Sequence, residues 1–334
     1  MSTTQTLTLG EIESLAHATL QAAGASPAQA APLAAAIAAA ERDGIASHGL
    51  AYLPTYCEHL RCGKVDGKAV PDVAQTRPAL LTVDAKSGFA HPAIDAGFER
   101  LIPLARQTGL AGMAVRNSYN CGVLGYHVER LASAGLLGMG FTNAPASIAP
   151  YGGKKAVIGT NPFAIAAPDG QGGVAISIDQ SASVIAKSEV MRRKRAGTSI
   201  PEGWAFGPDG APTTDPDVAL KGTMAPSGGY KGFGAGLMVE LLAAAASGAV
   251  LGLDASPFSG TAGGPPRTGQ FFIAIDAGAS SGDVFGSRVA RLVEAIAAQE
   301  GARVPGGARK AARQRSSNGV AVSADLLAQI KTLA

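Results

Sequence analysis

The segment Arg42-Asp43-Gly44-Ile45-Ala46-Ser47-His48-Gly49 follows an alanine-rich helix that the sequence predicts from Ala30 to Ala40. Gly44 and Gly49 favour turns on both sides of His48, which hold its backbone while the imidazole stays reachable. A histidine exchanges its proton near neutral pH, as a general acid must. His48 is therefore a candidate proton donor, and on these residues alone an ordinary polar residue in a turn is the alternative.

The helices around this segment have well-marked ends. Thr8 and Glu11 form a capping-box pattern, and Ser26 precedes a proline at the first position of the next helix. A third helix is predicted over Leu53 to Arg61, and Gly63 ends it. The first part of the chain is therefore predicted to be helical.

From Ala79 onward, short apolar runs typical of strands alternate with helices. The predicted strands are Leu80 to Val83, Ala111 to Val115, Leu137 to Phe141, Phe163 to Ala166, Val174 to Ile178 and Gln270 to Ile275. The other predicted elements are a surface loop from Pro201 to Pro216, a buried helix from Gly234 to Gly248, a helix from Val284 to Gln299 and a last helix from Ser323. This pattern indicates a mixed α/β protein.

Composition narrows the class of protein. The chain has 334 residues, of which 46% are hydrophobic, so it can bury a large core in one large domain or two. A net charge of +3 is too small to indicate nucleic acid, although it suits phosphate-bearing or carboxylate ligands. The first 23 residues lack the pattern of a signal peptide, and the apolar run Leu241 to Leu253 is too short to cross a membrane. Three cysteines in no disulfide pattern then favour a cytoplasmic location.

Two nucleotide motifs are excluded by their spacing. Gly232-Phe233-Gly234-Ala235-Gly236 places its third glycine one residue too early for the Rossmann fingerprint, and no stretch matches a P-loop. Gly278-Ala279-Ser280-Ser281-Gly282 does match the elbow of a serine hydrolase. All five histidines precede Ser280, which contradicts the order of that catalytic triad, so the hydrolase stays a remote alternative.

Two further clusters have simple interpretations. Cys57, His59 and Cys62 fall on different faces of one predicted helix, so we expect no metal site there. The basic run Arg192-Arg193-Lys194-Arg195 is typical of a solvated helix face, and attraction of the 2′-phosphate of NADP is the alternative.

Several segments, taken in order, resemble the malate/L-lactate dehydrogenase family. They are Arg42 to Tyr56, Asn117-Ser118 with Gly122, Tyr151-Gly152-Gly153, Gly159-Thr160-Asn161-Pro162, Asp179, Gly228 to Gly234 and Arg303-Val304-Pro305-Gly306. The resemblance covers nearly the whole chain. That family also includes ureidoglycolate, sulfolactate and diketogulonate oxidoreductases and the piperideine/pyrroline-2-carboxylate reductases.

The resemblance implies an α/β (α+β) fold without a Rossmann domain. A large, mostly antiparallel sheet domain over residues 76–284 would bind NAD(P) and form a homodimer. A helical domain would combine residues 1–75 with 285–334. The expected partner is a small carboxylate substrate, with neither nucleic acid nor membrane.

The resemblance also implies the site. His48 falls on the family's proposed acid and Asp179 on its electrostatic partner. The substrate-binding positions are Ser47, Tyr52, Asn120, Asn143 and Thr160. The cofactor-binding positions are Gly122, Ala175, Ile176, Ser177, Ile178, Ser181, Tyr230, Lys231, Gly306, Gly307, Ala308 and Arg309. Glycines 228, 229, 232 and 234 would let backbone amides approach a diphosphate beside Lys231, although a glycine-rich turn that merely starts a helix is equally compatible.

Two departures from the family pattern affect the substrate. Many relatives have arginine where this chain has Tyr52 and histidine where it has Asn120, so the pocket loses a fixed charge and a titrating group. The sequence favours a 2-oxo or 2-hydroxy acid of the malate, lactate or sulfolactate type, and reduction of a cyclic imine acid is the alternative. Arg192 and Arg309 favour NADP over NAD as the cofactor.

Overall fold

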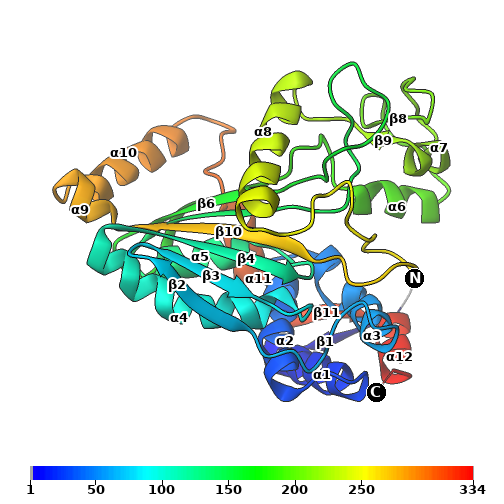
Figure 1. The fold of residues 1–334 in the computed structure, drawn as a ribbon, viewed down its shortest axis with the longest axis horizontal. Helices are drawn as coiled ribbons and strands as arrows, with labels where there is room; N and C mark the ends of the chain where they lie inside the picture. Colours follow the sequence, from blue (N-terminus) through cyan, green and yellow to red (C-terminus); the bar gives the residue numbers. More distant parts are fainter. Residues whose placement is uncertain (1–2, 334) are drawn as a thin grey trace.

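The computed structural model describes residues 3–333, and its centre is a seven-stranded sheet (Figure 1). In spatial order the strands are β2 (Asp72–Arg77), β3 (Leu80–Asp84), β4 (Leu110–Ser118), β10 (Thr268–Ile275), β5 (Leu137–Thr142), β6 (Phe163–Pro168) and β7 (Val174–Gln180). Only the β3 and β4 neighbours run parallel within this sheet. The expected mixed α/β fold with a large, mostly antiparallel sheet is confirmed.

Two helices cover one face of the sheet. Helix α4 (Ala90–Thr108) packs on β3 and β4, and α5 (Leu124–Ser133) packs on β5 and β6. Buried apolar side chains such as Phe98, Leu131 and Phe272 fill the space between helices and strands. The apolar face of each helix therefore holds it on the sheet.

The helical unit is built from both ends of the chain. Strand β1 (Thr4–Leu7) pairs with β11 (Val320–Ser323), beside α1 (Leu9–Ala22), α2 (Pro27–Arg42), α3 (Leu53–Arg61) and α12 (Ala324–Lys331). Thr8 and Glu11 form the predicted capping box, and Ser26 caps α2. These predicted helix starts are confirmed.

The expected division at residues 75/76 and 284/285 stays a prediction, and the structure shows which elements lie on either side of these positions. Helices α9 (Ala277–Ser281) and α10 (Phe285–Ala297) project from the opposite end of the sheet from α12, and α10 contacts β7 (Figure 1). Helix α11 (Gly307–Arg315) follows α10 and returns the chain to the helical unit, where the Ser316 hydroxyl donates to the Arg42 carbonyl at 2.9 Å. The sheet begins within the segment 1–75, because β2 pairs with β3.

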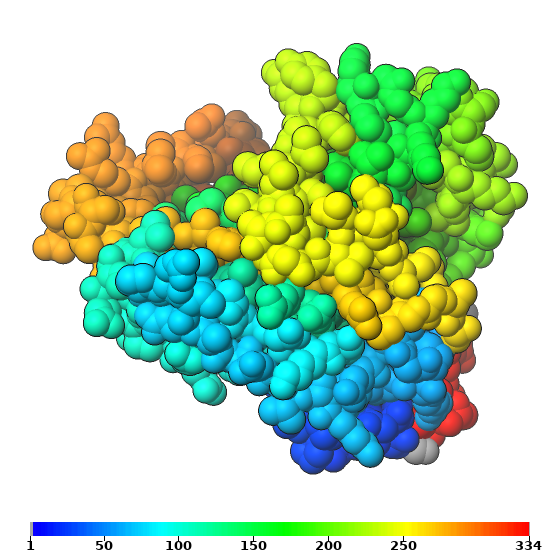
Figure 2. Space-filling model, in the orientation of Figure 1, coloured from blue at the N-terminus to red at the C-terminus, as the bar shows by residue number. Residues whose placement is uncertain are grey.

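A smaller lobe, green to yellow in Figure 2, stands on the side of the sheet away from α4 (Figure 1). It contains α6 (Lys187–Arg195), β8 (Ala205–Phe206), α7 (Pro216–Lys221), β9 (Thr223–Met224) and α8 (Tyr230–Glu240), around an apolar core of its own. The π-helical segment η3 (Leu241–Ala246) continues α8 and contacts β10.

The expected buried helix from Gly234 to Gly248 is only partly buried. Leu237, Met238 and Leu241 are 41%, 45% and 58% exposed, because only one side of α8 and η3 meets the sheet. Across residues 3–333, every helix is too short or too polar to cross a membrane.

Candidate active site

His48 lies on a short 3-10 turn, η1 (Ala46–His48), directly after α2. Gly49 follows, and a side chain there would displace the Glu41 carboxylate, which accepts a hydrogen bond from the Leu50 amide at 2.7 Å. Ser47 Oγ lies 3.0 Å from His48 Nδ1. The backbone and one ring nitrogen of His48 are thus held in place.

The surroundings of His48 shift its proton affinity in two directions. Burial lowers the pKa of His48, and the negative charge of Asp179 raises it by a smaller amount. The ring also lies parallel to that of Tyr52, with 6.5 Å between centroids. The structure therefore brings the two predicted catalytic side chains within electrostatic reach of each other.

Asp179 lies near the end of β7 and is held by two donors. Its Oδ2 accepts hydrogen bonds from the Gly125 amide at 2.9 Å and from Arg309 Nη2 at 2.5 Å. A side chain at Gly125 would displace the Arg309 guanidinium and the Asp179 carboxylate from their present positions. In the part of the chain that the structure describes, Asp179 acts on His48 through space rather than through a direct hydrogen bond.

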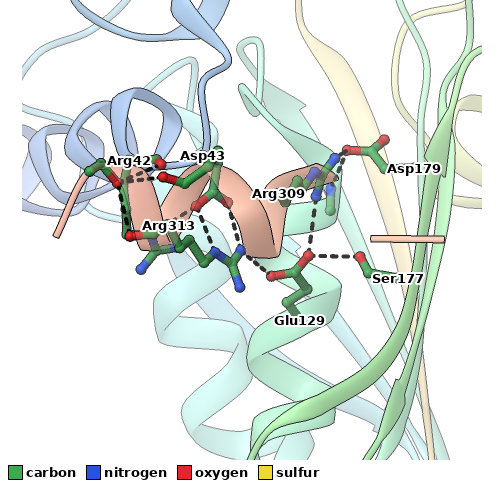
Figure 3. Close-up of polar contacts among 10 residues, drawn as sticks. Arg42, Asp43, Glu129, Ser177, Asp179, Arg309 and Arg313 are labelled. Atoms are coloured by element: carbon green, nitrogen blue, oxygen red, sulfur yellow. Dashed lines mark hydrogen bonds and ion pairs between the residues drawn. The ribbon is translucent and has the colours of Figure 1, made fainter. Parts of the chain in front are cut away.

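Asp179 ends a row of alternating charges along α11, which we call the ion-pair row (Figure 3). In order, the row consists of Asp43, Arg313, Glu129, Arg309 and Asp179, with contacts of 2.6, 2.5, 3.3 and 2.5 Å between neighbours. Ser177 Oγ also donates to Glu129, at 2.7 Å. The row joins α2, α5 and β7 through one helix.

Glu129 and Arg313 were not among the predicted site residues. Both lie in ordinary amphipathic helices, where charged residues normally face solvent. The spacing of Arg309 and Arg313, four residues apart, does place them on one face of a helix. Their acidic partners are distant in the sequence, so only the folded chain reveals them.

A glycine turn at the start of α11 lies against β7. Gly306 has a left-handed φ of +92°, and the Ser177 amide donates to the Pro305 carbonyl at 3.2 Å. Residues 303–308 line a hollow of about 440 Å³. Free amides at a helix N-terminus beside a glycine suit a phosphate, so this turn fits part of a dinucleotide.

The structure brings most of the predicted cofactor positions together. The strand 175–181 and the turn Gly306-Gly307-Ala308 adjoin, and Gly122 precedes α5, whose Gly125 reaches Asp179. Arg309 lies there too, but its guanidinium is bound to Glu129 and Asp179.

Tyr230 and Lys231 lie apart from this group in the described chain. They begin α8 in the smaller lobe, where the Tyr230 ring meets that of Tyr151 at 6.1 Å and lies below the Lys231 ammonium. The basic run on α6 is largely paired within that lobe: Arg192 binds Glu189 at 2.6 Å, and Lys194 binds Asp217 at 2.5 Å.

The predicted substrate positions fall into two groups. Near His48, the Tyr52 hydroxyl donates to the Phe258 carbonyl at 3.2 Å, and burial raises the pKa of Tyr52 while Asn120 opposes that shift. Asn120 Oδ1 accepts from the Gly122 amide at 2.7 Å. Asn143 instead lies buried and bonded to the Gly269 amide and the Val250 carbonyl.

Thr160 lies near the end of the long connection between β5 and β6, and hydrogen bonds hold this segment in place. The Thr160 carbonyl accepts from the Ala182 amide at 2.8 Å. The next residue, Asn161, has a left-handed φ of +41° and donates to the buried Glu240 carboxylate at 2.7 Å. The bonds of Asn161 thus stabilise an unfavourable backbone conformation beside Thr160.

A buried histidine pair, His91 and His127, lies beside Gly122. Neither histidine was among the predicted site residues. The rings of His91 and His127 are 5.3 Å apart, and a side chain at Gly122 would press on the His91 Nε2 atom. Among the described residues, the Nδ1 atoms of both histidines lack a hydrogen-bond partner. Burial lowers the pKa of His91 well below its usual value and that of His127 to about 3.

This burial predicts acid sensitivity. Below pH ~6.5 the unfolded chain binds a proton at His127, whereas the folded chain stays neutral there down to about pH 3. As the pH is lowered from 6.5, the free energy of unfolding should therefore fall by about 1.4 kcal/mol for each pH unit, from this group alone. Urea unfolding of His127→Phe between pH 6.5 and 5 should show a shallower pH dependence than the parent. An equal dependence in both proteins would contradict this.

The structure gives no support to the serine-hydrolase motif at Ser280. Ser280 lies on the short, projecting helix α9, and its hydroxyl donates to the Ala277 carbonyl of the same helix at 3.2 Å. His59 hydrogen-bonds to the Tyr119 hydroxyl and to the Gly260 carbonyl. These contacts give Ser280 and His59 structural roles.

A histidine near a carboxylate, beside a glycine turn at a helix N-terminus, is the arrangement of an acid–base enzyme with an anionic cofactor or substrate. A sequence profile of the malate/L-lactate dehydrogenase family matches residues 7–331. The chain belongs to this family of oxidoreductases.

Relatives of known activity cover nearly the whole chain. A (2R)-3-sulfolactate dehydrogenase (NADP(+)) of Chromohalobacter salexigens is 46% identical over 92% of both chains. A Δ1-pyrroline-2-carboxylate reductase of Ancylobacter novellus is 40% identical over 98% of this chain and 97% of its own. The crystal structure of a Δ1-piperideine-2-carboxylate reductase from Pseudomonas syringae superposes with a TM-score of 0.93 at 36% identity, over 99% of this chain and 100% of its own.

Proposed function

We propose that the protein transfers a hydride between NAD(P) and a small 2-oxo or 2-hydroxy acid of the malate, lactate or sulfolactate type. The observation that carries this proposal is the position of Asp179, which is bound to Arg309 on the strand beside the Gly306 turn and whose charge acts on His48. The 46% identity with a sulfolactate dehydrogenase supports the hydroxy-acid class.

Each side chain has a defined task in this proposal. The nicotinamide, when bound, supplies or accepts the hydride. His48 donates a proton to the substrate oxygen during reduction, with Ser47 beside its Nδ1 atom. Burial makes the protonated His48 a stronger acid, and the charge of Asp179 partly restores its proton affinity. A substrate carboxylate nearby would add to this second effect.

We assign substrate binding to neutral hydrogen-bonding groups. Tyr52 and Asn120 lie near His48, and Thr160 lies in the connection between β5 and β6. Asn143 contributes indirectly, because its own amide is bonded within the protein. Without an arginine at position 52, the substrate carboxylate lacks a bidentate clamp at that point.

The second candidate is reduction of a cyclic imine acid, with His48 protonating the nitrogen. The close superposition on a piperideine-2-carboxylate reductase and the identity with pyrroline-2-carboxylate reductases favour it. The neutral Tyr52 and Asn120 would accept either substrate, since both carry a carboxylate beside the reacting carbon.

We propose NADPH as the preferred cofactor and NADH as a weaker one, supported by the NADP(+)-dependent relative. Because Arg309 and Arg192 are paired with acidic side chains, the exposed Arg303 beside the hollow is the better candidate for the 2′-phosphate. We further propose a cytoplasmic homodimer. The exposed apolar residues Leu237, Met238, Leu241 and Leu292 support an interface between copies.

One assay separates the two candidate substrate classes and the two cofactors. Sulfopyruvate, oxaloacetate, pyruvate and the two cyclic imine acids are supplied in parallel with NADPH or NADH, and the loss of reduced-cofactor absorbance is followed. We expect the largest kcat/KM with an oxo acid and NADPH. A larger value with pyrroline or piperideine carboxylate would select the second candidate. No turnover of any of these compounds would reject both.

A further inference from the structure

Arg309 is the cation of the ion-pair row that binds Asp179, and its side chain is well enclosed. The side chains of Arg309, Asp179 and Glu129 are only 16%, 14% and 10% exposed. Arg309 Nη1 meets Glu129 at 3.3 Å, and Nη2 meets Asp179 at 2.5 Å (Figure 3). Pairs this far from solvent are screened far less than surface salt bridges. The charge of Arg309 therefore acts strongly on Asp179.

The two donors to Asp179 occupy the same oxygen. Arg309 Nη2 and the Gly125 amide both donate to Oδ2. Within residues 3–333, Oδ1 receives no hydrogen bond, and the charge of the carboxylate acts on His48 through space. Glu129 binds both Arg309 and Arg313, and Arg313 in turn binds Asp43 at the end of α2. The orientation of the carboxylate is thus determined by α11.

We propose that Arg309 is a positioning residue that fixes Asp179 through Oδ2 and limits how strongly that carboxylate attracts the proton of His48. This inference rests on the proposed role of His48 as proton donor. Arg309 then acts through Asp179 rather than by contact with the cofactor, although it directly follows the Gly306-Gly307-Ala308 turn.

The charged and titratable groups around the pair are few. His48 is influenced by Asp179 from β7, by Tyr52 on the following turn and by His91 from α4, which is buried and neutral. Asp179 faces Arg309 from α11 and the buried thiol of Cys121. Arg309 is therefore the cation that directly pairs with the Asp179 carboxylate among the described residues.

Removal of the Arg309 charge should shift the pKa of His48 in a predictable direction. In Arg309→Met the field of Asp179 at His48 is no longer opposed, so the pKa of His48 should rise by about one unit. Arg309→Lys keeps the charge but not the two-pronged geometry, so it should produce a smaller rise. Arg309→Gln keeps a donor without the charge and tests the electrostatic part if the methionine variant fails to fold.

The test measures His48 directly. Histidine Cε1–H signals are titrated by NMR in the unliganded protein, with His48→Ala to assign one of the five histidines. Arg315→Met is the matched control, because Arg315 is an exposed arginine on the same helix. We expect an upward shift in Arg309→Met, none in Arg315→Met, and a dissociation constant for NADPH within threefold of the parent.

Two results would overturn the inference. One is an unchanged His48 titration in a folded, charge-free variant. The other is a tenfold or greater loss of NADPH affinity, which would make Arg309 a cofactor ligand rather than a residue that acts through Asp179. Because the titration needs neither substrate nor turnover, it still decides this question if the substrate assays fail and the proposed function itself is wrong.

In an active enzyme, the same change should appear in the rate. Reduction needs protonated His48, so its rate falls as the pH rises through the pKa of that residue. The alkaline limb of the kcat profile should therefore move to higher pH in Arg309→Met. A loss of kcat that is equal at every pH would indicate a purely structural role for Arg309.

Discussion

His48→Ala should lower turnover by roughly a hundred- to ten-thousand-fold, the typical contribution of a placed general acid. The imidazole has no substitute in its immediate turn, because Ser47 is a far weaker acid and Asp179 is bound to Arg309. NADPH should bind as before, because the Gly306 turn and β7 stay intact. Steady-state kinetics and a fluorescence titration with NADPH measure the two quantities.

A matched control uses another histidine of the chain. His17→Ala, on α1, should keep turnover close to that of the parent. If His48→Ala also keeps near-normal turnover, His48 is not the proton donor. A parallel loss of NADPH binding would instead indicate that the turn after α2 supports the cofactor site.

The second large effect concerns stability. Glu129→Gln should lower the free energy of unfolding by about 3 kcal/mol, because it leaves two buried or half-buried guanidinium groups without their shared counter-charge. Glu129 is 10% exposed, whereas Arg313 is 32% exposed and can turn partly toward solvent, so we expect the lower end of the range for buried pairs. Urea unfolding followed by circular dichroism measures the change.

Glu13→Gln is the control for this prediction, since Glu13 is an exposed carboxylate on α1. It should alter the free energy of unfolding by no more than about 0.5 kcal/mol. A similarly small change in Glu129→Gln would show that the ion-pair row contributes little to stability, with Arg309 and Arg313 satisfied by Asp179 and Asp43 alone.

Local patterns in the sequence determined the secondary structure and the position of the candidate acid. The capping box of Thr8 and Glu11, the apolar strand runs and the glycines around His48 act over a few residues, so they can be read in order along the chain. Local patterns do not predict burial, which depends on the neighbouring elements. The apolar residues of α8, for example, are about half exposed although a buried helix was expected. The family resemblance added the large, mostly antiparallel sheet and the candidate role of Asp179, whereas the strand order came from the structure.

Tertiary structure alone decided which groups act on His48 and Asp179. Arg309, Glu129 and Asp43 are separated by many residues in the sequence, and they meet only because α11 lies between α2, α5 and β7. Burial likewise turned His91 and His127 into neutral groups, although nothing beside them in the sequence indicates it. The sequence names the residues that can carry charge, whereas the packing of distant elements sets their distances and removes the water around them, and electrostatic interactions depend on both.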